Sequence, residues 1–423
     1  MSFSFKITKQ GKNTKARLGE ITTPHGLIHT PVFMPVGTAG SIKAMKPEEV
    51  AGMGAEIILA NAYHLYLRPG HKLVEKLGGL HRFMNWPGPI LTDSGGYQVF
   101  SLGREPDQRQ QGGRHTELEE LRKTKLAKIT EEGVHFQSHV DGSPHFMTPE
   151  LSIEIQEALG SDIMMVFDDC TPYPATIEET RASMERSLRW EERSLKAVDR
   201  GSWMVDSEKQ KTKSEGRALF AIIQGGIYRE LRRECLERLM QINDSRSTPA
   251  RLQFGGIHDP RFSGYAIGGL SVGEPIEQMY EMAAYCASLI PSDYSRYLMG
   301  VGWPTDIIAC IDHGIDMFDC VIPTRNARNG QLFVPSGTIQ IKQNQYAEDG
   351  RPIDEACSCY TCCHYSRAYL RHLYLSREVM SPALNTIHNL HYFLNLLGEV
   401  RLAIENDRFP EFKNNFFNKI RGD

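Results

Sequence analysis

The sequence lacks long apolar runs, a strong excess of either charge and any leader-like start. No stretch approaches the roughly 18 uninterrupted apolar residues of a membrane-spanning helix, so we expect no membrane span. Residues 1–19 contain no apolar segment of signal-peptide length, which favours a cytoplasmic protein. The 48 basic and 52 acidic residues give a net charge of −4, so any nucleic-acid-binding surface must be local.

Several common catalytic motifs are also missing. The chain has no HExxH pair, no P-loop and no nucleophile elbow, and no G-x-G-x-x-G follows a first strand. These absences argue against a zinc protease, a P-loop nucleotidase, an α/β-hydrolase and a dinucleotide-binding sheet. Four of the nine cysteines crowd into 357–363 and the others are scattered, which is not the pattern of a disulfide framework and suits a reducing compartment.

The crowded cysteines predict a structural zinc site. Cys357, Cys359 and Cys362 lie in CSCYTC, and His388 follows in NTIHNL. Three thiolates and one imidazole fill a tetrahedron and leave no open position, so such a site holds structure and does not activate water. Cys363 could replace Cys362 as a ligand, and the spacing alone does not choose between them.

Short apolar runs recur along the chain and end in Gly, Asn or Asp. Uniformly apolar short strands are typical of a parallel sheet that helices cover on both faces. Eight such strands alternating with helices over about 300 residues predict a (β/α)₈ barrel, with a doubly wound open sheet as the alternative. The expected strands are 31–37, 56–64, 89–96, 162–169, 218–226, 265–269, 297–302 and 317–321.

Helix signals and polar segments complete the expected organisation. Thr148 and Pro149 predict the start of a helix that ends at Gly160, and 274–290 and 304–314 are two further helices. We expect a catalytic barrel over 1–330, with an N-terminal extension, and a zinc-binding helical subdomain over 331–423. The polar segments 104–128, 199–216 and 243–263 are expected to be inserted surface loops.

Polar groups stand at the carboxyl ends of the expected strands. In a barrel of this type these ends meet at one rim, where reacting groups lie. Two aspartates at one rim can divide the work, since one can attack or stabilise a cation while the other moves a proton. The strand-end residues are Asp93, Ser94, Asp168, Asp169, Cys170, Gln224, Gly268, Gly269, Asp319 and Cys320.

Aromatic and basic residues follow the cysteine cluster. Tyr365, Tyr369 and the pair His372–Leu373 fall about one helical turn apart and predict one stripe, which suits an interface centre. The alternative is that this stripe packs back onto the barrel. The nearby arginines 367, 371 and 377 fit a nucleic-acid or partner surface, and equally a solvated helix face.

Seven segments, in order, resemble the tRNA-guanine transglycosylase family. They are TDSGGYQVFSL (92–102), FDDCTPYPA (167–175), IIQGG (222–226), YAIGGLSVGE (265–274), YLMGVGWPTD (297–306), FDCVIPTRNARNG (318–330) and the CSCYTC…His cluster. The resemblance covers nearly the whole chain. It implies a zinc-containing (β/α)₈ barrel that exchanges the wobble guanine of certain tRNAs for a 7-deazaguanine, acting as a homodimer.

The resemblance also implies roles for single residues. Asp319 would be the nucleophile and Asp93 the general acid/base. Arg325 and Arg328 would hold the anticodon loop, and Cys357, Cys359, Cys362 and His388 would bind Zn²⁺. The base pocket would consist of Tyr97, Asp168, Cys170, Gln224, Gly269, Leu270 and Met299.

Two residues of the expected base pocket indicate which subtype of the family the chain resembles. Cys170 and Val272 match the bacterial enzymes, which insert preQ1 (7-aminomethyl-7-deazaguanine), whereas Ser271 and the 104–128 insertion depart from the usual pattern. A catalytically silent tRNA-binding partner subunit is the alternative, and retention of Asp93, Asp168 and Asp319 argues against it. A zinc-dependent hydrolase is disfavoured because the Cys₃His set is closed.

Overall fold

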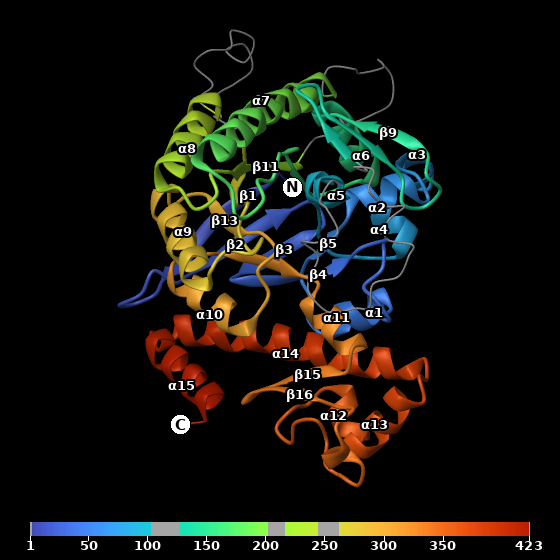
Figure 1. Cartoon of the computed structure of the whole chain (residues 1–423). Helices are drawn as coiled ribbons and strands as arrows, with labels where there is room; N and C mark the ends of the chain where they lie inside the picture. Colours follow the sequence, from blue (N-terminus) through green and yellow to red (C-terminus); the bar gives the residue numbers. More distant parts are fainter. Residues whose placement is uncertain (1, 103–126, 202–215, 244–261, 423) are drawn as a thin grey trace.

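The chain folds around a closed barrel of eight parallel strands (Figure 1). The computed structural model describes residues 2–102, 127–201, 216–243 and 262–422. The barrel strands, in order around the barrel, are β4 (Val32–Gly37), β5 (Ile58–Ala60), β6 (Ile90–Thr92), β10 (Ile163–Met165), β11 (Ala218–Ile223), β12 (Gly264–Ile267), β13 (Ser295–Leu298) and β14 (Met317–Cys320). This closed arrangement confirms the predicted barrel and excludes the open sheet.

Each of the eight expected strands is present, but several are shorter than their apolar runs. The run 56–64 is strand only as far as Ala60. Asn61 then caps the helix α2 (Ala62–Leu67), because its side chain accepts a hydrogen bond from the His64 backbone N–H at 3.3 Å. The local capping signal of Asn61 therefore ends the strand inside the predicted run.

The helix predicted after Thr148 is confirmed as α6 (Pro149–Leu159). The Thr148 hydroxyl accepts from the Leu151 N–H at 3.2 Å, and Gly160 ends the helix in the left-handed region at φ 82°. The helices expected over 274–290 and 304–314 are α9 (Ile276–Leu289) and α10 (Pro304–Asp312). The remaining barrel-side helices are α1 (Pro47–Gly52), α3 (His71–Lys76), α4 (Gly79–Met84), α5 (Gly96–Leu102), α7 (Ile177–Gly201), α8 (Arg229–Asn243) and α11 (Ile322–Arg328).

An antiparallel sheet of β1 (Ser4–Gln10), β2 (Arg17–Thr23) and β3 (Gly26–Thr30) lies against the end of the barrel where the strands begin, called here the barrel floor. Arg17 anchors it. Its guanidinium donates to both oxygens of Asp316, just before β14, at 2.9 and 2.6 Å. Both side chains are buried, so this ion pair fixes the sheet in register with the barrel.

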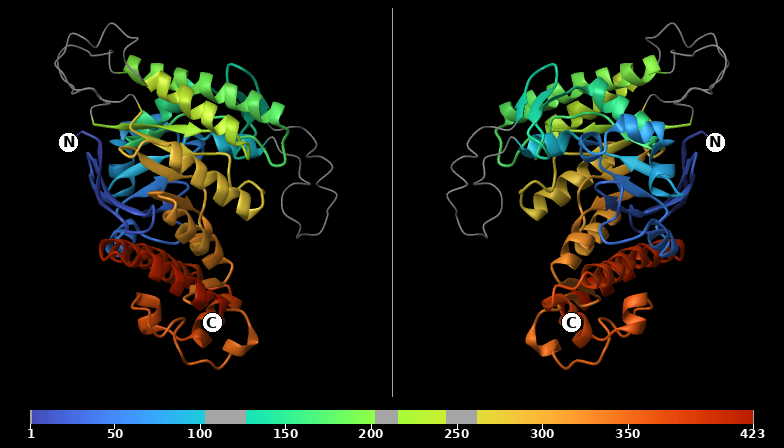
Figure 2. Two further views of the ribbon diagram at one scale, coloured as in Figure 1. Left: turned by 90° about the vertical axis from the view of Figure 1, so that its left-hand side faces the viewer. Right: turned by 90° about the vertical axis from the view of Figure 1, so that its right-hand side faces the viewer.

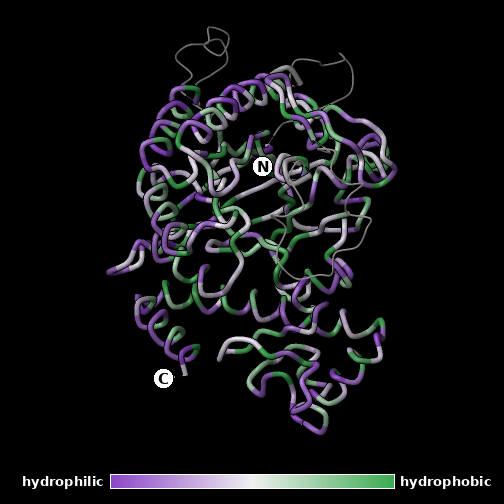
Figure 3. The backbone as a smooth tube through the Cα atoms, viewed as in Figure 1, coloured by the Kyte–Doolittle hydropathy of each residue, from purple (hydrophilic) through white to green (hydrophobic). Residues whose placement is uncertain are grey.

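A second small sheet, which the sequence analysis did not predict, lies between β6 and β10 in the chain. It consists of β7 (Ala127–Ile129), β8 (Val134–Gln137) and β9 (Pro144–Met147). The expected surface loops at 104–128, 199–216 and 243–263 fall largely outside the described residues. Figure 3 shows apolar residues along the barrel strands, where the core is buried, and polar residues on the outer helices.

The C-terminal part continues from the barrel without a break in packing (Figure 2). It contains β15 (Gln331–Val334), β16 (Gly337–Gln340), α12 (Tyr360–His364), α13 (Arg367–Leu375), α14 (Met380–Glu405) and α15 (Phe409–Arg421). Phe393 of α14 is fully buried, with its ring centre 4.9 Å from that of Phe33 in the barrel and 5.1 Å from that of Phe333 in β15. Helix α14 therefore packs on the barrel and on the zinc-binding part together.

Within the described residues, no helix is both long enough and apolar enough to cross a membrane.

Candidate active site and zinc centre

Asp93 directly follows β6, at the end of the barrel where the strands finish, called here the barrel mouth. Its Oδ1 accepts from the Ala62 N–H at 2.8 Å, and its Oδ2 accepts from Asn61 at 2.5 Å and from Gln98 at 3.1 Å. Burial and the charge of Asp319 together raise the pKa of Asp93 to about 7, although these hydrogen bonds act to lower it. The group can therefore hold or release a proton near neutral pH.

Asp319 stands in β14 on the facing side of the mouth. The Tyr297 hydroxyl donates to its Oδ1 at 2.6 Å, and the Gly300 N–H donates to the same oxygen at 2.8 Å. Burial raises the pKa of Asp319, while these two donors oppose the rise. Both donors contact Oδ1, so Oδ2 is the oxygen that is left to face a substrate.

Asp168 and Gln224 form a hydrogen-bonded pair at the same mouth. The Gln224 amide donates to Asp168 Oδ2 at 2.7 Å, and both side chains are buried. Burial, with the neighbouring charge of Asp169, raises the pKa of Asp168 to about 7. Gly269 lies against this pair in the left-handed region at φ 63°, and a Cβ there would meet Gln224 Oε1 at 2.4 Å. A glycine is therefore required beside Gln224.

Helix α7 holds the strand end that carries Asp168. Ser187 Oγ accepts from the Asp169 N–H at 2.9 Å, and Ser183 Oγ donates to the Asp169 carbonyl at 2.7 Å. Arg186 is ion-paired with the Asp169 carboxylate. Asp169 thus has a structural role, unlike the other three strand-end aspartates.

A buried glutamate on α7 extends this support to the next strand. Glu191 accepts from the Ile222 N–H of β11 at 3.3 Å, two residues before Gln224. Its side chain is fully buried, and burial together with the charge of Asp168 raises its pKa well above the usual range. Burial therefore favours the neutral form of Glu191, behind the pair of Asp168 and Gln224.

The sequence analysis missed these supporting residues for different reasons. Asn61 also stands at a strand end, so the rule that found Asp93 could have found it. Tyr297 begins the apolar run YLMGVG and is expected there as a core residue, so nothing in the run indicates that its hydroxyl contacts Asp319. The polar positions of α7 occur at helical spacing, which a solvent-facing stripe also shows.

The remaining predicted pocket residues lie around this acidic rim. Tyr97 is exposed in α5, Met299 is half-buried just after β13, and Cys170 and Leu270 are buried. The Glu274 carboxylate accepts from the backbone N–H groups of Ser271 and Val272, which folds the loop after β12. Ser271 itself is exposed with φ 58°, so this loop adopts a backbone conformation that non-glycine residues rarely take.

Arg325 and Arg328 lie one turn apart on α11, directly after Asp319 and Cys320 in the chain. Both side chains are exposed, and Arg328 donates to the Thr324 carbonyl at 3.0 Å. Guanidinium groups at this position form a local basic surface on a protein of small net charge.

The four predicted zinc ligands converge. His388 Nδ1 lies 3.8 Å from Cys357 Sγ, 3.6 Å from Cys359 Sγ and 3.3 Å from Cys362 Sγ. These separations suit four donors that surround one ion at bond lengths of about 2.0–2.3 Å. Cys363 is exposed and donates to the Ser358 carbonyl, so it is not part of the cluster. The structure therefore selects Cys362.

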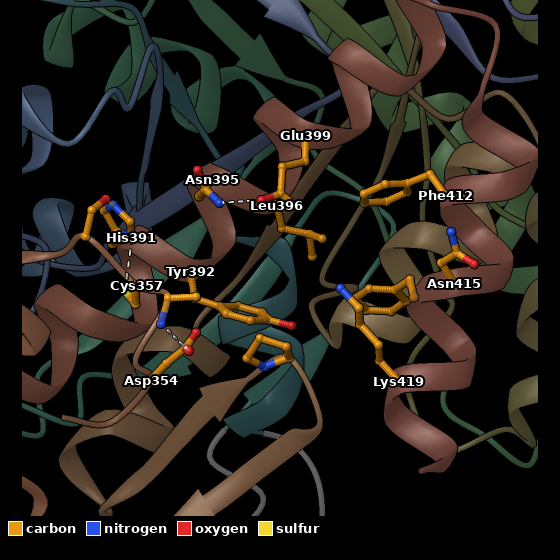
Figure 4. A pocket seen from close by; sticks show the side chains of 14 residues that line it. Asp354, Cys357, His391, Tyr392, Asn395, Leu396, Glu399, Phe412, Asn415 and Lys419 are labelled. Atoms are coloured by element: carbon orange, nitrogen blue, oxygen red, sulfur yellow. Dashed lines mark hydrogen bonds between the residues drawn. The ribbon is translucent and has the colours of Figure 1, made fainter. Parts of the chain in front are cut away.

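The surroundings of the cluster also fit a structural zinc. His388 Nε2 bonds to the Phe333 carbonyl of β15 at 2.7 Å, which fixes the ring with Nδ1 facing the sulfurs. His391, one turn further along α14, lies 3.6 Å from Cys357 Sγ through its Nδ1. Figure 4 shows this histidine at the edge of a cavity of about 430 Å³ between α14 and α15.

The predicted aromatic stripe is only partly right. The rings of Tyr365 and Tyr369 stack with centres 5.4 Å apart, and Tyr369 is 40% exposed. His372 continues this surface, with its ring centre 6.5 Å from that of Tyr369. Leu373, in contrast, is buried with Leu370 in the core of the zinc-binding part, although it lies one turn from Tyr369 on α13. Tyr365 precedes the helix, whose N-cap is Ser366.

The fold is a (β/α)₈ barrel with buried aspartates at its mouth and a closed Cys₃His cluster outside it. This is the arrangement of a zinc-containing barrel enzyme. The model of the family described as queuine tRNA-ribosyltransferase matches residues 12–422. The chain belongs to this family.

Bacterial relatives are similar in sequence to this chain over nearly its full length. A queuine tRNA-ribosyltransferase of Caldanaerobacter subterraneus subsp. tengcongensis is 49% identical over 100% of this chain and 98% of its own length. One from Thermoanaerobacter sp. strain X514 is 50% identical over 99% and 98%, and one from Vibrio campbellii is 47% identical over 99% and 97%.

The assignment of Cys362 and not Cys363 gives a matched pair of variants. Cys359→Ser and Cys362→Ser should each lower zinc, measured after dialysis against a mild chelator, to well below one per chain. They should also lower the midpoint of thermal unfolding, because the ion links α12, α14 and β15. Cys363→Ser is the control and should retain one zinc per chain. Chelator-treated wild type with full activity and well under one zinc would contradict a structural role.

Proposed function

We propose that this chain exchanges the wobble guanine in the anticodon of tRNAs with GUN anticodons for preQ1, in queuosine biosynthesis in the bacterial cytoplasm. Family membership supports the transfer of a ribosyl-bound base in tRNA. The observation that carries the proposal is the pair Asp93 and Asp319 on facing strands of one mouth, beside Asp168 and Gln224. Cys170 and Val272 support preQ1 as the incoming base.

Asp319 is the proposed nucleophile. Its Oδ2 attacks the anomeric carbon of the ribose and the bond to guanine breaks, which gives a covalent aspartyl-ribose ester. Tyr297 and Gly300 hold Oδ1 and so fix the direction of the attacking oxygen. Burial raises the pKa of Tyr297 well above its usual range, so this hydroxyl keeps its proton and remains a donor.

Asp93 is the proposed general acid/base. Protonated Asp93 gives its proton to guanine as it leaves, and the resulting carboxylate accepts a proton from the incoming base, which then displaces Asp319. Two displacements at one carbon retain its configuration, as in retaining glycosidases. One glycosidic bond replaces another, so the overall exchange needs no oxidant and no nucleotide triphosphate.

The base is recognised beside these two groups. Asp168 and Gln224 face its polar edge, the Gly269 N–H its carbonyl and the Leu270 carbonyl its 7-substituent, while Tyr97 and Met299 enclose the ring. A base inside a stacked anticodon loop is out of reach of these groups, so it must leave the stack. Arg325 and Arg328 are placed to bind the loop phosphates, since guanidinium groups bind phosphate in a fork.

A silent tRNA-binding subunit makes a different prediction from an enzyme. Incubation of the protein with radiolabelled guanine and an anticodon-loop RNA separates the two, because only an enzyme incorporates the label. Loss of label incorporation in the Asp93 and Asp319 variants, with RNA binding kept, would assign the activity to this mouth. RNA binding without incorporation in the wild type would favour the silent subunit.

Asp319→Asn should abolish base exchange and form no covalent RNA adduct, because an amide cannot attack the anomeric carbon. The adduct is measured on a denaturing gel after incubation with the RNA. Tyr297→Phe is the comparison: it removes one hydrogen bond to Oδ1 and should still form the adduct at a lower rate. An adduct trapped with the Asn variant would reject Asp319 as the nucleophile.

The pKa of Asp93 near 7 predicts the pH dependence of adduct formation. Guanine departure needs protonated Asp93, so the single-turnover rate should fall about tenfold per pH unit well above pH 7. Asp93→Ala should lower turnover about 10²-fold or more and remove this decline. Asp168 has a similar pKa, so Asp168→Asn is the control and should keep the decline while it weakens base binding.

The exposed ring stack supports the homodimer. The stack consists of Tyr365, Tyr369 and His372 and offers the aromatic surface that interface centres favour. Tyr369→Ala should weaken dimerisation and lower activity with full tRNA while zinc content stays normal. Leu375→Ala is the control, since this residue is 51% exposed on the same helix outside the stack. A wild type that sediments as a monomer at micromolar concentration would reject this interface.

A further inference from the structure

Three potential ligand residues converge at the barrel floor, at the opposite end of the barrel from the proposed active site. His25 lies in the turn between β2 and β3, His81 lies in α4, and Asp162 directly precedes β10. One donor atom of each lies within 4.8 Å of the others. The three elements are far apart in the chain, so the tertiary fold alone creates this cluster.

Each oxygen of Asp162 faces a different ring. His25 Nδ1 lies 2.7 Å from Oδ1, and His81 Nε2 lies 3.2 Å from Oδ2. The His81 contact lacks hydrogen-bond alignment, so among the described residues this buried nitrogen has no hydrogen-bond partner. The two rings are stacked with centres 3.6 Å apart and an interplanar angle of 15°.

The charge of Asp162 is compensated differently from that of the other aspartate at the floor. Asp316 is paired with Arg17, which is always charged. Asp162 is equally buried, yet in the described chain no ion pair joins it to a lysine or arginine, and nearby Arg217 donates to the Glu157 carbonyl.

We propose that His25, His81 and Asp162 form a second metal site, for a divalent transition-metal ion such as Zn²⁺. Two imidazoles and a carboxylate are a common donor set for such ions, and water completes the tetrahedron. The His25 side chain is 42% exposed, which leaves the fourth position open to solvent. Binding displaces the proton that His25 shares with Asp162, and the rings turn to aim their nitrogens at the ion.

The site would join three parts of the molecule that otherwise meet only through side-chain packing and hydrogen bonds. Asp162 is already fixed to the barrel, because its Oδ2 accepts from the Ile90 N–H of β6 at 2.9 Å. A bound ion would tie the β2–β3 turn and α4 to this point. The expected effect is greater resistance to unfolding, because a ligand that binds only the folded state stabilises it. Base exchange at the mouth should not change.

The test is a metal count on untagged, full-length protein. Wild type equilibrated with micromolar free Zn²⁺ should hold two ions per chain, and His25→Ala should hold one. His29→Ala is the matched control, because His29 is paired with Glu56, just before β5, and no third ligand lies beside this pair in the described residues; this variant should hold two ions. With Co²⁺, the first equivalent should give thiolate charge-transfer absorption, and the second should add only the weaker absorption of nitrogen and oxygen ligands.

Two results would overturn the proposal. One is a wild type that binds a single ion at saturating zinc, and the other is a second ion that His25→Ala retains. His81→Ala and Asp162→Asn should also lose the second ion, and the thermal midpoint of each variant without added metal shows whether it is folded. Zinc should raise that midpoint in wild type and in His29→Ala but not in His25→Ala. Base exchange serves as an independent readout, so failure here leaves the proposed activity untouched.

Discussion

Closure of the barrel is the constraint on which the rest of the structure depends. Hydrogen bonding between β14 and β4, with Met317 paired to Val32 and Cys320 to Pro35, joins the last strand to the first. Once the ring is closed, the ends of all eight strands face one rim. That rim brings Asp319 close enough to Asp93 for its charge to raise the pKa of Asp93. In a doubly wound sheet of the same strands, the first and last strands would not be hydrogen-bonded neighbours.

Burial of the carboxylates at the rim raises their pKa values, and it also requires hydrogen bonds that replace the lost water. The two aspartates at the mouth are held by hydrogen bonds that partly compensate for lost hydration: Asp93 by Asn61 and Gln98, and Asp319 by Tyr297. The remaining imbalance leaves Asp93 with a pKa of about 7. The same balance applies to Glu191 behind Asp168, because burial raises its pKa well above the usual range although it accepts from the Ile222 N–H.

Helix α14 connects the catalytic barrel to the zinc cluster. His388 reaches the sulfurs from one part of this helix, while Phe393, Leu397 and Val400 from a later part are buried in the core shared with the barrel strands. Asn389 adds a polar link, because its amide donates to the Pro323 carbonyl near the mouth at 3.0 Å. The metal therefore orders the same helix that packs behind the strand and helix carrying Asp319, Arg325 and Arg328.

The sequence by itself determined the barrel strands, the capped helix after Thr148 and the presence of the zinc cluster, because apolar runs, caps and cysteine spacing are local signals. It also identified Asp93, Asp168 and Asp319 as rim residues, since a strand end can be recognised without knowing its neighbours. Local signals could not show that Cys362 and not Cys363 joins the cluster, that Leu373 is buried, or that Asp169 forms an ion pair with Arg186. Only the tertiary structure decided these, and only it brought His25, His81 and Asp162 together, because each depends on which elements pack side by side.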